Sequence, residues 1–289
     1  MHARSLCFAA AVLSATHAYA ATAADTQVRA ALTGAGEVAR LTVTSGGKHA
    51  GVTLAIGKAR PTALYVGDAA ATIEAGHGRV LVAVSIDAAK HPFQIVMVDG
   101  GKIGTPLALA RPNQRADYPF AVAATATPDG FTVFFQEVEP NNPNEAHTYM
   151  VELDKTGAVA EEPREIQVPW ALAAAAWNGK GYHLGLYYSG GGDGVRLSMV
   201  SLTAQGAPEQ HPDWASQPGL VSDVHLVLAG RRIRAFYRGG MGDRLHETDV
   251  TTIGQWGQVR GKAKDLGALG ARQAIAITAK GGATKISAR

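Results

Sequence analysis

The chain has 289 residues, of which 46% are hydrophobic and 18% are charged, and its formal net charge at pH 7 is +3. Such a balanced chain lacks the concentrated basic surface that nucleic acids require, so we expect no nucleic-acid partner. The single cysteine excludes an intrachain disulfide framework.

The first twenty residues have the layout of a secretory signal. Arg4 gives a basic start, residues 6–13 form a short apolar core, and Ala18-Tyr19-Ala20 is a small-x-small cleavage site. Cys7 lies inside this segment, so the mature chain contains no cysteine. We therefore expect a cleaved signal peptide over residues 1–20 and a periplasmic or secreted product.

The mature chain has room for one large domain. We expect residues 21–36 to be a flexible N-terminus and residues 37–289 to form a single domain. No later segment has the roughly twenty consecutive apolar residues that a membrane span needs, so we expect none.

Turn glycines recur about every fifty residues in two interleaved series of five. An apolar, mostly alternating run follows each glycine of the first series. A fixed period of this size, with several short strands in each unit, is typical of a β-propeller. The first series is Gly78, Gly130, Gly181, Gly230 and Gly281, and the second is Gly47, Gly104, Gly157, Gly206 and Gly257.

In chain order, the first expected strands are a hairpin, residues 37–43 and 51–56, around the Gly46-Gly47 turn. Four units with up to four strands each follow. Alanine-rich first strands are explained by crowding near a propeller axis. The strands of these units are expected at 70–75, 79–86 and 93–98; at 120–127, 131–137 and 147–154; at 171–177, 181–188 and 195–202; and at 223–228, 231–238 and 244–250.

The fifth unit is split between the two chain ends. Residues 271–278 and 283–288 supply two strands, and the N-terminal hairpin aligns with the outer pair of the other units. Pairing the chain ends would remove exposed sheet edges. We therefore predict an all-β, five-bladed propeller closed by N-terminal outer strands pairing with C-terminal inner strands. The alternatives are a six-bladed ring with a degenerate blade, which needs more residues, and a two-sheet sandwich.

The strand order assigns the connections to two faces. Turns between strands one and two, and three and four, are short and define the short-turn face. The other connections define the long-loop face, where we expect function because binding residues concentrate on loops held by a rigid scaffold. The long loops are 87–92, 137–146, 189–194 and 239–243 within blades, and 60–68, 111–119 and 208–222 between blades.

Several loops carry candidate ligand-binding groups. Residues 137–145, beginning with Glu137, hold three carboxylates and three amides, which suit calcium or sugar hydroxyls but equally a solvated turn. Asp193 and Asp243 each end a glycine run at the same position of successive units. Arg60 and Arg115 lie before expected innermost strands, where they would bind an anion if they converged.

Signals of other chemistries are missing from the sequence. His246-Glu247 begins like a zinc-protease helix but lacks the second histidine, and no other histidine spacing suits a metal. There is no serine elbow, P-loop or complete dinucleotide fingerprint. We expect no cofactor, with calcium as the alternative.

The phrase 128–137 (PDGFTVFFQE), followed by a strand and a turn glycine, resembles bacterial propeller repeats grouped as sialidase-like. The Asp-box turn of sialidases is not matched, because Asp249 precedes Gly254 by five residues instead of two. The chain also resembles five-bladed glycosidases in ring size. That resemblance implies axial carboxylates near blade starts, and the residues so positioned are Asp68, Asp117 and Asp223, with Glu137.

The sequence thus predicts an exported, non-catalytic propeller that binds a protein or saccharide partner through its long-loop face. The alternative is a glycan hydrolase using axial carboxylates; antagonism of a toxin is a third hypothesis. The predicted binding residues are Arg60, Arg115, Glu137, Asp193, Asp223, Arg238 and Asp243.

Overall fold

The computed structural model describes residues 25–46, 48–86, 93–109, 118–139, 142–189, 195–209, 213–214, 221–239, 244–249, 263–268, 275–280 and 283–288. Every regular element among them is a β-strand. Within these ranges there is no helix of the length and hydropathy that crossing a membrane would require.

Five antiparallel sheets form the blades of a propeller, each wound from the axis outward in chain order. The predicted all-β propeller is therefore confirmed. The first blade is β1 (Asp25–Leu32), β2 (Val38–Ser45), β3 (Gly51–Ile56) and β4 (Thr62–Val66); the second is β5 (Ala69–Gly76), β6 (Arg79–Ile86), β7 (Phe93–Asp99) and β8 (Lys102–Ile103), with β9 (Leu107–Leu109) also on β7.

The remaining blades repeat this order. They are β10 (Tyr118–Ala126), β11 (Gly130–Glu139), β12 (Asn142–Asp154) and β13 (Val159–Ile166); β14 (Ala171–Trp177), β15 (Gly181–Ser189), β16 (Val195–Thr203) and β17 (Asp213–Trp214); and β18 (Val221–Ala229), β19 (Arg232–Gly239), β20 (Arg244–Asp249) and β21 (Lys264–Ala268).

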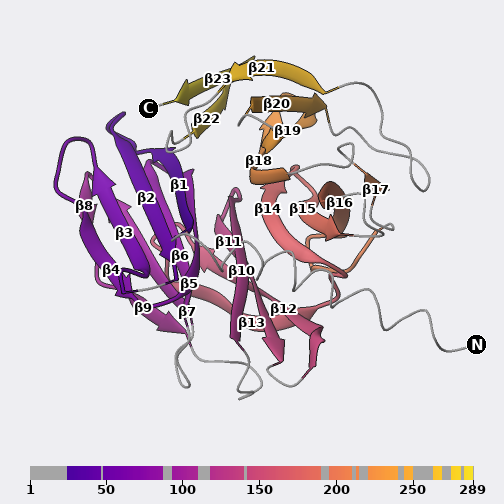
Figure 1. Cartoon of the computed structure of the whole chain (residues 1–289), viewed down its shortest axis with the longest axis horizontal. Helices are drawn as coiled ribbons and strands as arrows, with labels where there is room; N and C mark the ends of the chain where they lie inside the picture. The colour runs from indigo at the N-terminus through magenta and orange to yellow at the C-terminus, as the bar shows by residue number, and fades with distance from the viewer. Residues whose placement is uncertain are drawn as a thin grey trace, which may run out of the picture.

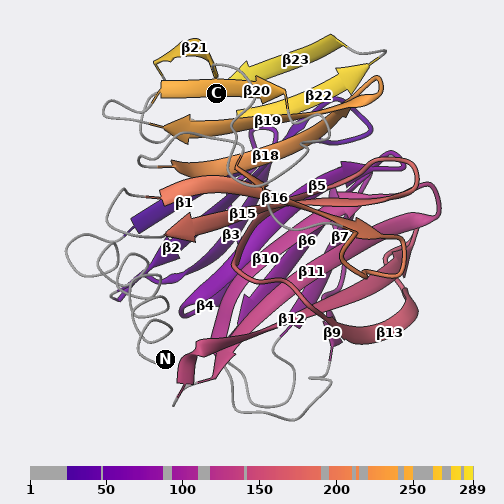
Figure 2. The ribbon, with the colours of Figure 1, turned by 90° about the vertical axis from the view of Figure 1, so that its right-hand side faces the viewer.

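A C-terminal hairpin of β22 (Ile275–Lys280) and β23 (Ala283–Ala288) completes the ring. Strand β22 lies against β18 on one side and β1 on the other, and β1 lies against β5 (Figures 1 and 2). Ala276 packs with Val28, Ala30 and Val38 of the first blade, whereas Ile275 packs with Phe236 of the fifth. The hairpin therefore fills the gap between the first and fifth blades.

The predicted mode of closure is not the one observed. Strands β2 and β3 are the middle strands of a complete sheet, while β22 and β23 pair only with each other among the described strands. Residues 25–32, expected to be flexible, form the innermost strand β1. The physical reason is that Ala30 and Ala31 bury their side chains within the ring. The structure thus combines five blades with a two-stranded sheet in a sixth position.

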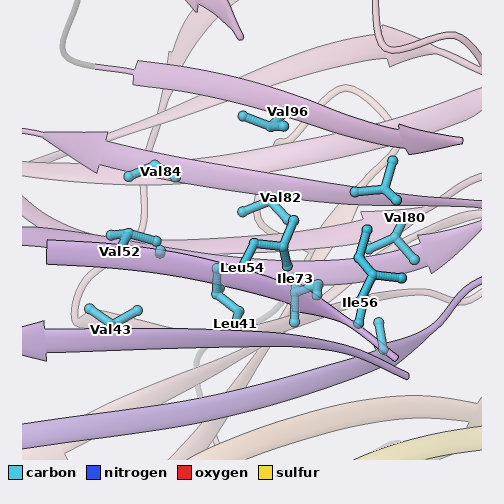
Figure 3. Close-up of a cluster of buried hydrophobic side chains, with 14 of the residues drawn as sticks. Leu41, Val43, Val52, Leu54, Ile56, Ile73, Val80, Val82, Val84 and Val96 are labelled. Atoms are coloured by element: carbon cyan, nitrogen blue, oxygen red, sulfur yellow. The ribbon is translucent and has the colours of Figure 1, made fainter. Parts of the chain in front are cut away.

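Hydrophobic side chains fill the space between consecutive blades. Between the first two, Leu41 and Leu54 meet Val80, Val82 and Val84, all less than 3% exposed (Figure 3). The alternating burial of β3 shows that such strands present apolar residues to a neighbouring blade at every second position. Equivalent clusters join blades two to three, three to four and four to five.

The fully buried Gln136 joins the third blade to the fourth. Its Nε2 atom donates hydrogen bonds to Thr148 Oγ1 at 2.9 Å and to the Trp170 carbonyl at 2.8 Å. Its Oε1 atom accepts one from the Leu172 backbone N–H at 2.7 Å. One amide therefore anchors the chain where it enters the innermost strand of the next blade.

We predict that Gln136→Leu lowers the free energy of unfolding by about 2–4 kcal/mol, because it leaves buried backbone groups without partners. Urea unfolding followed by circular dichroism measures the change. The matched control is Gln167→Leu at an exposed position. Equal midpoints for the two variants would contradict this role.

Candidate functional site

The inner strands enclose an axial cavity of about 530 Å³, a volume within the range of small-molecule sites. The innermost strands of all five blades contribute to its wall, together with β22 of the C-terminal hairpin. Alanine is the most frequent residue of the wall, and its small side chain leaves the space open. The lining residues are Arg29–Leu32, Thr72–Ala75, His77, Ala124–Pro128, Ala174–Trp177, Val224–Leu228 and Ile277.

The cavity lies toward the short-turn face. Its wall comes largely from the middle and later parts of the inner strands, and His77 and Pro128 belong to turns between first and second strands. Loop length in the sequence predicts function at the opposite, long-loop face. The long loops lie largely outside the described residues, so the prediction for that face stays a prediction.

Arg29 supplies a positive charge to the cavity wall. Its Nη1 atom donates to Thr72 Oγ1 at 3.3 Å, which links the first blade to the second. Its Nε atom is buried and has no hydrogen-bond partner among the described residues. Within that same part of the chain, no carboxylate lies within 4.0 Å of the guanidinium.

Glu74 supplies the only carboxyl among the described residues that line the cavity. Burial raises its pKa to about 8, while a backbone hydrogen bond with Ala126 acts in the opposite direction. At neutral pH the side chain is therefore mostly protonated, and it can donate a hydrogen bond. The indole Nε1 of Trp177 is another buried donor without a partner in the described chain.

Glu74→Gln tests the raised pKa. The carboxyl has a pKa of about 8 in the folded protein against 4.5 in the unfolded chain, so wild-type stability falls as pH rises through this interval. Glutamine does not ionise, so the variant lacks this fall. Its free energy of unfolding should rise relative to wild type between pH 5 and pH 8, measured by urea denaturation at about those two values.

Glu162→Gln, at an exposed position on β13, is the matched control. If the difference in the free energy of unfolding between wild type and Glu74→Gln stays constant between the two pH values, the raised pKa is ruled out.

Asp223 and Arg238, both predicted binding residues, lie together near the start of β18 and the end of β19. Arg238 Nε donates to Asp223 Oδ2 at 3.3 Å, and His225 Nε2 bonds the other carboxylate oxygen at 3.2 Å. Asp223 has a left-handed backbone, with φ of 49°. Burial alone would raise the pKa of Asp223, but His225, Arg29 and Arg238 outweigh it and lower that pKa to about 2.

The neighbouring Tyr187 belongs to the same cluster. Burial raises the pKa of its hydroxyl to about 12, and the backbone of Val224 and Asp223 hydrogen-bonds it. His225 lines the cavity, whereas Asp223 does not. The ion pair therefore holds the cavity-lining His225 without Asp223 itself lining the cavity.

We predict that Asp223→Asn lowers the free energy of unfolding at pH 7 by about 2 kcal/mol, because the ionised carboxylate loses its charged partners. Asparagine tolerates the left-handed backbone, so the change isolates charge. The folded pKa is about 2 against 3.8 unfolded, so the wild-type advantage should vanish as pH falls through about 2.

Urea denaturation at neutral and acidic pH measures this advantage. Asp129→Asn, in the exposed turn before β11, is the control. An advantage that persists unchanged into strong acid would contradict the charged-partner explanation.

The other predicted site residues do not join this cluster. Arg60 is exposed between β3 and β4 and so precedes an outermost strand, which corrects the expectation that it borders the axis. Glu137 is 1% exposed at the end of β11, so it is not an exposed loop ligand. Asp68 accepts a hydrogen bond from the Gly46 N–H at 2.9 Å. Arg115, Asp117, Asp193 and Asp243 lie outside the described residues.

Sequence reasoning missed Arg29, Thr72, Glu74 and Trp177. Arg29 lies in the segment that the sequence predicts to be flexible, but this segment forms the strand β1. Gly36, with φ of 80°, lies in the turn from β1 to β2, just as Gly78 lies in the turn from β5 to β6. The signal was therefore a turn glycine 42 residues before Gly78. Within the described residues, no three His, Cys, Asp or Glu side chains group to hold a metal.

Known structures share this fold. They include a subtype N10 neuraminidase-like protein of A/little yellow-shouldered bat/Guatemala/060/2010 (9% identity, 87% of each chain, TM-score 0.54). The SapL1 lectin in complex with alpha methyl fucoside matches at 13% identity over 92% of this chain and 89% of that one, with a TM-score of 0.54.

An α-L-arabinofuranosidase (CtGH43) from Clostridium thermocellum ATCC 27405 matches at 9% identity over 83% of this chain and 92% of that chain, with a TM-score of 0.50. No protein-family model and no curated protein sequence matches the chain. At these identities the likeness shows the fold alone, and it agrees with the propeller resemblance inferred from the sequence.

Proposed function

We propose that this protein binds a saccharide in the axial cavity without hydrolysing it. The observation that carries the proposal is the cavity itself, about 530 Å³ in volume, whose wall sets hydrogen-bonding side chains among alanines and larger aliphatic residues. Thr72, Thr125, Trp177 and the protonated Glu74 offer hydroxyl, indole and carboxyl groups of the kind that pair with sugar hydroxyls. A lectin bound to a fucoside is among the proteins with this fold.

The count of carboxyls favours binding over the alternative of glycan hydrolysis. Retaining and inverting glycosidases generally use two carboxyl groups about 5–9.5 Å apart across the scissile bond. Glu74 is the only one on the described cavity wall, and the nearby Asp223 is engaged by Arg238 and His225.

The proposal includes export to the periplasm or beyond, which rests on the predicted signal in residues 1–20. A saccharide-binding protein outside the cytoplasm would meet cell-surface and environmental glycans. Calcium and a protein partner at the long-loop face are not needed for this function.

Narrowing the cavity tests the site. Ala75 lines the cavity, and we predict that Ala75→Phe weakens saccharide binding at least about tenfold, because the ring would occupy ligand volume. A glycan array selects the ligand, calorimetry measures affinity, and a reducing-sugar assay on the same samples measures hydrolysis.

The control is Ala160→Phe at an exposed position of β13. Unchanged affinity in a folded Ala75→Phe protein would exclude the cavity as the site. Release of reducing ends by the wild type, lost on substitution of Glu74, would establish hydrolysis instead.

A further inference from the structure

The charges around the axial cavity do not cancel. Asp223 is paired with Arg238 and His225, so its charge is already compensated. Arg29 has no carboxylate within ion-pairing distance among the described residues. The one carboxyl on the described wall, Glu74, is kept mostly protonated at neutral pH by burial. One positive charge therefore remains on the cavity wall.

The guanidinium is also poor in hydrogen-bond partners. Of its five N–H donors, the described protein engages only Nη1, through Thr72 Oγ1 at 3.3 Å. That contact fixes the direction of the side chain, since Thr72 is itself 5% exposed and belongs to the rigid second blade. A guanidinium held in place with unused donors is suited to an oxyanion, which accepts from such a fork in charge-assisted bonds.

We propose that the axial cavity selects an anionic saccharide, whose carboxylate or sulfate group binds Arg29. This inference rests on the proposed saccharide-binding function and names the class of its ligand. The uncharged groups of the wall, Thr125, Trp177 and Glu74, would contact the sugar hydroxyls, while the alanine wall from β10 and β14 sets the width of the site.

The other titratable groups on the described wall are compatible with an anion. His225 is hydrogen-bonded to Asp223, and His77 Nε2 donates to the Thr127 and Gly130 carbonyls at 2.8 and 3.1 Å. Neither histidine adds a negative charge that would repel the ligand. Arg29 is thus the one permanent cation on this part of the wall.

The experiment compares saccharides that differ only in charge. Calorimetry measures the affinity of the full-length mature protein for oligogalacturonides and their methyl esters, and for sulfated oligosaccharides and their desulfated forms. We expect the anionic member of one pair to bind about ten- to a hundredfold more tightly, the range for a hydrogen bond to a charged group. The preference should shrink as salt is added.

Variants assign the preference to Arg29. Arg29→Gln should bring the two members of the pair to within about twofold, whereas Arg29→Lys should keep part of the preference because it keeps the charge. Arg40→Gln, an exposed position on β2, is the matched control and should bind as wild type does. The carboxylate and sulfate pairs identify which oxyanion is recognised.

The outcomes separate the two proposals. Equal binding of charged and neutral saccharides overturns the selection of an anion and leaves saccharide binding standing. Binding of no saccharide overturns both. If Arg29→Gln does not fold, two other results decide the role of Arg29. A wild-type preference for the anionic saccharide that is insensitive to salt overturns that role. An Arg29→Lys protein with the affinity and selectivity of wild type also overturns it.

Discussion

Each blade of this ring packs its sheet between two neighbouring sheets, and this constraint governs the rest of the structure. Apolar side chains alternate toward the preceding and following blades, so each blade needs a neighbour on both sides. The C-terminal hairpin meets that need for the first and fifth blades, through Ala276 and Ile275. A ring closed in this way is held by packing between sheets, and it requires no hydrogen-bonded ladder between the two ends of the chain.

The same closure creates the site. Six inner strands converge on one axis, and small residues such as Ala174, Ala175 and Ala176 keep their backbones from crowding it. The hollow is consequently a product of the scaffold rather than of its loops. Polar groups on the inner strands then gain precise positions: Thr72 holds Arg29, and Trp177 is tied to the third blade through its backbone N–H on Thr125 Oγ1 at 3.0 Å.

Periodicity made most of the fold readable from sequence, because strand alternation and turn chemistry are local. The strand expected at 171–177 matches β14, and 195–202 nearly matches β16. Closure was not readable, since the turn after β1 departs from the regular glycine spacing and partner choice between sheets is non-local. Asp223 and Arg238 could be selected as charged residues near blade ends. Arg29 and Glu74 could not, because only the ring brings distant strands to one cavity.

The charged groups of Asp223 and Arg29 differ in how many polar partners surround them, and this difference indicates what each charge does. A buried ion is tolerated when partners surround it, and Asp223 has two such partners with both carboxylate oxygens engaged. Arg29 has one hydroxyl and a buried Nε without a partner among the described residues, which opposes folding. Arg29 helps to keep Asp223 ionised, but that long-range attraction leaves the unused donors of its guanidinium without partners among the described residues. A partly satisfied cation on the wall of a cavity is better explained by a ligand that completes its hydrogen bonds than by the architecture that holds it.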